Sequence, residues 1–137
     1  MPETRMVVKL KATSAVTDLI GAGELCRLRK HQRKTAWEDN DAITYQRIST
    51  EPVNHATGTT STAFARIQLD LWSSTPAGIR DLAAAVRGAL SGWSDEAGSP
   101  AVSMCHLINE MDMPEGPESG DETAEQRIMQ EYLIQYS

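Results

Sequence analysis

The chain has 137 residues, of which 40% are hydrophobic and 23% are charged, a balance typical of one folded globular domain. Its formal net charge of −6 argues against a protein held on nucleic acid by phosphate neutralisation, which requires a basic surface. No apolar run approaches the roughly 20 residues of a membrane-spanning helix, and the first residues lack the pattern of a secretory signal. We therefore expect a single domain over residues 1–137 with no membrane partner.

The N-terminal segment predicts a helix. Apolar residues between Met6 and Ile20 recur at helical spacing, with a break in the pattern near Thr13. Gly21 follows the last apolar residue, and glycine readily adopts the left-handed conformation that ends many helices. The sequence thus predicts one amphipathic helix, interrupted in its middle, ahead of the first strand.

The next segments alternate between strands and polar connections. Residues 25–28 predict a short strand, and residues 31–41 a polar loop with a basic first half and an acidic second half. A second strand is expected over 42–50. Residues 52–61 are rich in Thr, Ser and Asn and contain a glycine, which predicts a long, exposed and flexible hairpin connection.

Residues 62–93 form the best-defined unit of the sequence. Side chains alternate across a strand, and the odd positions from 63 to 71 are all apolar. Thr75 and Pro76 then supply a helix cap and a first-turn proline. Apolar residues follow at helical spacing, namely Ile79, Leu82, Ala83, Val86, Leu90 and Trp93. Because the strand and the helix each have one apolar face, we expect them to bury these faces together in two layers.

The C-terminal third predicts two more strands, at 102–111 and at 128–136, separated by an acidic segment with proline and glycine. We expect this segment, residues 110–125, to be a second flexible loop. The predicted fold class is α+β: a two-layer, mostly antiparallel sheet of about five strands with two helices, in the order α-β-β-β-α-β-β.

The sequence contains no pattern typical of a catalytic, cofactor-binding or metal site. Cys105 and His106 are neighbours in a predicted strand, so their side chains point to opposite faces and cannot act as a dyad. The three histidines have no metal-ligand spacing. Cys26 lies far from Cys105, and we expect both thiols to be free. We expect a protein that is not an enzyme and needs no cofactor.

Two charged stretches and two aromatic residues are candidates for contacts. The basic stretch contains Arg27, Arg29, Lys30, Arg33 and Lys34, and the acidic stretch contains Glu110, Asp112, Glu115, Glu118, Asp121, Glu122 and Glu125. Both stretches are explained either as solvated surface or as complementary patches that meet across subunits or line a channel. Phe64 and Trp72 lie on the even face of the central strand, where a helix or a neighbouring subunit would cover them.

The order of several segments resembles the siphophage tail-completion proteins, also called tail-terminator or tail-to-head joining proteins. The matching segments are Ile-Thr-Tyr-Gln-Arg-Ile-Ser at 43–49, His55 and Gly58, Ala-Arg-Ile-Gln-Leu-Asp-Leu-Trp at 65–72, and the helix at 81–90. The resemblance implies a structural virion protein in a ring, typically hexameric, assembled in the host cytoplasm. Such a ring closes the tail tube, docks it to the head-connector protein and leaves a channel for DNA. The family has no catalytic residues, so the resemblance implies none in this chain.

For such a ring subunit, the candidate contacts with other subunits or with the connector are Arg29, Lys30, Arg33, Lys34, Phe64, Trp72, Glu115, Glu118, Asp121 and Glu122. The partners would be further copies of the chain, the tail-tube protein and the head-connector protein, with DNA passing through unbound. The alternative is a small cytosolic protein-binding module of the same two-layer class. The mass in solution distinguishes the two, because a ring is several times heavier than the 15.0 kDa chain.

Overall fold

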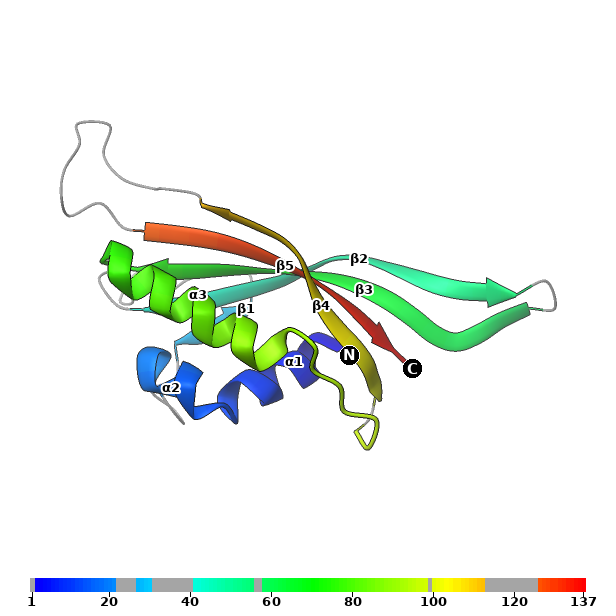
Figure 1. The fold of residues 1–137 in the computed structure, drawn as a ribbon. Coiled ribbons are helices and arrows are strands. Elements are labelled where there is room, and N and C mark those ends of the chain that lie inside the picture. The colour runs from blue at the N-terminus through cyan, green and yellow to red at the C-terminus, as the bar shows by residue number, and fades with distance from the viewer. Residues whose placement is uncertain (1, 22–26, 31–40, 56–57, 99, 113–125) are drawn as a thin grey trace.

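The computed structural model describes residues 2–21, 27–30, 41–55, 58–98, 100–112 and 126–137. All the helices of this part lie on one face of a sheet, so the chain forms two layers (Figure 1). The helices are α1 (Pro2–Lys11), α2 (Ser14–Ile20) and α3 (Pro76–Leu90). The strands are β1 (Leu28–Lys30), β2 (Ala42–His55), β3 (Gly58–Ser73), β4 (Val102–Asp112) and β5 (Gln126–Tyr136). The predicted α+β class is confirmed, and the interrupted N-terminal helix is resolved into two helices.

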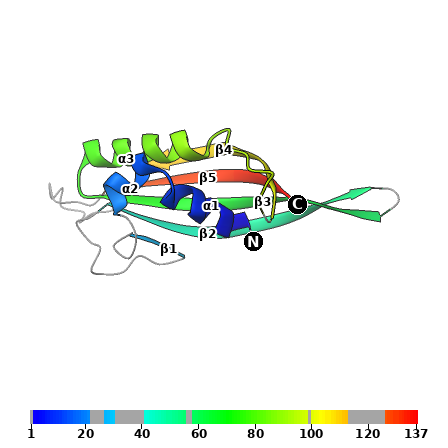
Figure 2. The same cartoon turned by 90° about the horizontal axis from the view of Figure 1, so that it is seen from below.

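The five strands have the spatial order β1-β2-β3-β5-β4. The last four pair antiparallel, whereas β1 pairs with β2 in parallel over only three residues. The C-terminal strand β5 therefore lies between β3 and β4, and β4 forms one edge of the sheet (Figure 2). The opposite edge is formed by β1 and by the length of β2 that β1 leaves uncovered.

Two of the predicted boundaries were wrong. The hairpin connection expected at 52–61 is mostly strand, since β2 continues to His55 and β3 begins at Gly58. Threonines are common here, and β-branched residues favour extended backbone even where the segment is polar. Residues 58–62 of β3, which precede Ala63, pair with β2 alone. This two-stranded arm projects past the helices (Figures 1 and 2). Of the short strand expected at 25–28, residues 25 and 26 lie outside the described residues, and the described strand β1 runs from Leu28 to Lys30, where it pairs with β2.

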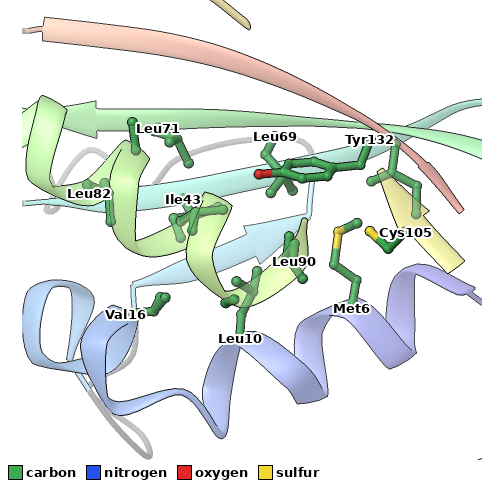
Figure 3. Close-up of a cluster of buried hydrophobic side chains, with 14 of the residues drawn as sticks. Met6, Leu10, Val16, Ile43, Leu69, Leu71, Leu82, Leu90, Cys105 and Tyr132 are labelled. Atoms are coloured by element: carbon green, nitrogen blue, oxygen red, sulfur yellow. The ribbon is translucent and has the colours of Figure 1, made fainter. Parts of the chain in front are cut away.

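The helix cap of α3 forms as predicted. The Thr75 side chain accepts a hydrogen bond from the Gly78 backbone N–H at 2.9 Å, and Pro76 takes the first helical position. The helix then buries Leu82, Val86 and Leu90 completely against the sheet (Figure 3). The predicted packing of α3 on the odd face of β3 is confirmed.

The N-terminal helices complete the hydrophobic core. Their core side chains are Met6, Leu10, Val16 and Ile20, and the first turn of α1 also buries Pro2 and Glu3. Met6, Leu10 and Val16 point toward α3 and the sheet (Figure 3), and Ile20 belongs to the same cluster. Gly21 has a φ of 91° directly after α2, a conformation that glycine adopts without a steric cost. No helix in the described part of the chain is both long enough and apolar enough to cross a membrane.

The thiol of Cys105 lies in this core and is free, whereas Cys26 lies outside the described residues. Burial raises the pKa of Cys105 to about 12, so the thiolate form is scarce at neutral pH. In a Cys26→Ser variant we therefore expect almost no alkylation of the native protein at pH 7 and rapid alkylation in denaturant. Mass spectrometry of the intact chain measures the difference. Equally fast alkylation in both states would contradict the buried position.

Candidate interaction surfaces

The sheet face opposite the helices is the first candidate surface. Alternation places the odd residues of β3 in the core, so the even residues from 64 to 72 lie on the other face. No helix of the described part covers this face (Figures 1 and 2). Phe64 and Trp72 both lie there, as the sequence predicted, and both are half-buried.

A polar network holds Trp72 in place. The Arg127 guanidinium lies over the Trp72 ring, 4.7 Å from its centroid, and Arg127 Nη2 is 3.0 Å from Asp70 Oδ1. Gln68 Nε2 donates to the same oxygen of Asp70 at 3.2 Å. On the other side, Trp72 Nε1 donates to Thr44 Oγ1 at 3.4 Å. The indole is therefore braced from both neighbouring strands, and β3 presents it in a defined orientation.

The charges on this face are paired with each other. Besides the Asp70–Arg127 pair, Arg66 Nη2 lies 3.0 Å from Glu131 Oε1 on the adjacent strand. Each pair joins one cation and one anion, so these four residues add no net charge to the face. An approaching polyanion would therefore meet little attraction or repulsion from them.

Phe64 is remote from this network. It lies opposite Glu51 and Gln135 in the outer part of the sheet. Phe64 and Trp72 are eight positions apart in one strand, which corresponds to about 26 Å at the usual rise per residue. The two aromatic residues share a face but do not form one patch.

The structure describes only part of the two charged stretches. Lys30 is exposed in β1, next to Arg29 in the same strand. Most of the predicted contact residues lie outside the described residues, namely Arg33, Lys34, Glu115, Glu118, Asp121 and Glu122. The start of the acidic segment differs from the expected loop, because Glu110 and Asp112 belong to β4.

Glu110 contacts one residue of α3 and one residue of β5. It forms an ion pair with Arg87 of α3, and it accepts a hydrogen bond from Gln130 Nε2 at 2.8 Å. Gln130 also donates to the Ala83 carbonyl at 3.2 Å and accepts from the buried Tyr132 hydroxyl at 2.8 Å. Burial raises the pKa of Tyr132, so the hydroxyl stays protonated as a donor. A chain of hydrogen bonds thus runs from the core to the surface between α3 and β4.

The sequence reasoning missed both networks. Arg127 reaches Asp70 and Trp72 only because β5 pairs with β3 in one register. The second network had one usable signal, since Gln130 is a polar residue between Ile128 and Tyr132 on the apolar side of the last strand. A polar residue in an apolar row needs a buried partner.

The hollows of the described surface are shallow. One of about 280 Å³ lies between α3 and β4 and is lined by Arg80, Arg87, Glu110 and Asp112, among others. The described residues include no group of three or more His, Cys, Asp or Glu side chains that could hold a metal ion. The structure therefore directs attention to the open sheet face and the sheet edges, and it defines a small two-layer protein with candidate contact surfaces.

Comparisons with known proteins identify the family. The family described as "Tail completion protein gp17" matches residues 4–120, and the chain belongs to this family. It is a structural protein of a virion tail. Comparison with curated proteins gave no match.

A solved structure confirms the fold. A chain of the structure titled "Virion of native gene transfer agent (GTA) particle" is similar, with a TM-score of 0.70 and 14% identity, over 96% of this chain and 90% of that chain. A second solved chain, whose title is only an identifier, aligns over 98% of this chain and 96% of its own. Its identity is 12% and its TM-score of 0.47 is too low to support a conclusion.

Proposed function

We propose that this chain is the ring-forming subunit that ends the tail tube and joins the tail to the head connector. The match to the tail-completion family over residues 4–120 carries the proposal. The similarity in fold to a chain from a virion particle supports it, since a domain of this architecture then has a place in such an assembly. The ring would be hexameric, and its role would be structural, with no catalysed reaction.

In a closed ring, each subunit contacts its two neighbours through two different surfaces, because the interface is head-to-tail. The upper and lower faces of the ring then remain free to bind other proteins. One free face would stop the polymerisation of the tail-tube protein, and the other would bind the head-connector protein. The two-stranded arm formed by residues 58–62 and the end of β2 extends past the helix layer, where it would contact one of these partners.

DNA would pass through this ring without being held. The net charge of −6 disfavours binding to the phosphate backbone, and the ion pairs of Asp70 with Arg127 and of Arg66 with Glu131 leave little free charge on the open sheet face. The acidic residues Glu115, Glu118, Asp121 and Glu122 would either line the channel or bind the basic stretch of a neighbouring subunit.

The decisive experiment assembles particles with and without this chain. Without it, we expect tails of uncontrolled length that stay separate from filled heads, and added protein should restore joined particles in electron micrographs. Cross-linking of intact particles with glutaraldehyde should trap a species several times the 15.0 kDa chain mass. Normal joined particles that lack the chain would overturn the proposal and favour the alternative binding module.

A variant with Gln at positions 115, 118, 121 and 122 tests the acidic segment. If these side chains line the channel, the variant should bind DNA more strongly at low salt, because the repulsion between carboxylate and phosphate is lost. If they bind a neighbour, the ring should weaken and depend less on salt. Unchanged joining, DNA affinity and ring mass would show that the segment is only solvated surface.

A further inference from the structure

The two edges of the sheet differ in charge. Over the described residues, β4 is the last strand of the sheet and pairs with β5, while its first part is also bonded on the outer side, Val102 to Asp95 and Cys105 to Gly92. From His106 to Asp112 no other described strand pairs with β4, so this part of its outer side is open. This edge, which we call the acidic edge, exposes Glu110 and Asp112. The opposite edge, formed by β1 and the uncovered part of β2, exposes Lys30, Arg47 and the single carboxylate Glu51, and we call it the basic edge. Each subunit therefore has opposite charges on its two sides.

The charges on the two edges lie at the same height of the sheet. The pairing register places Lys30, Tyr45, Leu69, Gln130 and Glu110 on one row across all five strands. Paired residues share a face, so the Lys30 and Glu110 side chains both lie on the helix side of the sheet. A second copy placed beside the first without a vertical shift would bring Lys30 opposite Glu110.

Each edge also exposes an isoleucine at a β-bulge. Ile48 interrupts the pairing of β2 with β3 and is 46% exposed, and Ile108 interrupts the pairing of β4 with β5 and is 43% exposed. Both directly follow residues of one row, which joins Arg47 to Leu107 across the sheet. Bulges usually protect an edge against strand addition. Here each places an apolar side chain next to this row, Ile48 on one side of it and Ile108 on the other, because β2 and β4 run in opposite directions.

We infer that, in the ring proposed above, the acidic edge of one copy docks against the basic edge of the next copy. This inference rests on the proposed function and adds the contact through which the ring closes. The occupant is a second copy because Lys30 and Glu110 carry opposite charges on one row at opposite edges of this chain, and each edge exposes an isoleucine next to the row of Arg47 and Leu107. Contact between two acidic edges would instead bring Glu110 and Asp112 of both copies together, which like-charge repulsion disfavours.

Because the two edges are different surfaces, their contact is head-to-tail and repeats around a ring. The contact also places the helix layer on one side of the resulting wall and the open sheet face on the other. Trp72 and the paired charges around it would then face the same side in every copy.

The first test is cross-linking in assembled particles with a short bis-maleimide reagent. In a Cys26→Ser background, which leaves only the buried Cys105, we introduce Ile48→Cys and Ile108→Cys together. We expect a ladder of multimers up to the closed ring. Each cysteine alone should leave the chain monomeric, since the contact joins different edges. A dimer from either single variant would show like-edge contact and overturn the inference.

Glutaraldehyde cross-linking of the same particles separates the two proposals. If glutaraldehyde traps the ring but the double-cysteine chain gives no ladder, the edge contact is wrong and the ring stands. If glutaraldehyde traps no multimer, the ring itself is wrong.

Charge reversal supplies a second test. Lys30→Glu should lose tail joining at low salt, because it places a carboxylate opposite Glu110 across the contact. Lys11→Glu makes the same charge change at an exposed helix position and should have no effect. Normal joining by the Lys30→Glu variant at low salt would overturn the inference.

Discussion

Replacing Leu82 or Leu69 by alanine is expected to lower the free energy of unfolding by about 2–5 kcal/mol. Leu82 on α3 and Leu69 on β3 are both fully buried in the cluster that joins the helix layer to the sheet. Alanine removes the apolar contact and leaves a cavity that the surrounding side chains fill only in part. Urea denaturation followed by circular dichroism measures the change.

Val8→Ala is the matched control, because Val8 is 54% exposed on α1 and alanine is a better helix former. We expect a change within about 0.5 kcal/mol for this surface substitution. A loss below about 0.5 kcal/mol for both leucine variants would mean that α3 does not pack on this face of β3.

Replacing Gln130 by methionine is expected to cost about 1–3 kcal/mol, although the two side chains have similar volumes. Gln130 accepts the hydrogen bond of the buried Tyr132 hydroxyl and donates to Glu110 and to the Ala83 carbonyl. Methionine fills the space but leaves the hydroxyl without this partner inside the core. A buried donor without an acceptor loses its hydration and gains nothing in return.

The double variant Gln130→Met with Tyr132→Phe should be more stable than the sum of the two single changes predicts. Removing both partners of a buried hydrogen bond costs less than orphaning one of them. A double-mutant cycle in urea gives this coupling directly. Strictly additive losses would show that the bond between Tyr132 and Gln130 does not contribute to stability.

The edge contact and the core network meet at one residue. Glu110 is held on the helix side of the sheet by Arg87 and Gln130, and it lies on the open edge of β4. Its carboxylate is therefore ordered within the subunit before any neighbour arrives, so little side-chain freedom remains to be lost on contact. Variants of Glu110 would disturb both roles, whereas Lys30→Glu changes the contact from the other edge.

The sequence by itself determined the elements whose causes are local. The alternation from 63 to 71, the Thr75 cap and the helical spacing up to Leu90 each depend on neighbours a few residues away. They predicted β3, α3, their shared core and the open face that carries Trp72. The same reasoning was wrong for 52–61, because polar composition is compatible with a loop and with a solvent-exposed strand pair.

Only the tertiary structure decided what lies between distant segments. The insertion of β5 beside β3 brings Arg127 to Asp70, and the pairing of β4 with β5 brings Glu110 to Gln130. The same registers place Lys30 and Glu110 on one row at opposite edges. Strand order and register arise from the burial of the whole apolar face at once, and no short stretch of sequence contains that information.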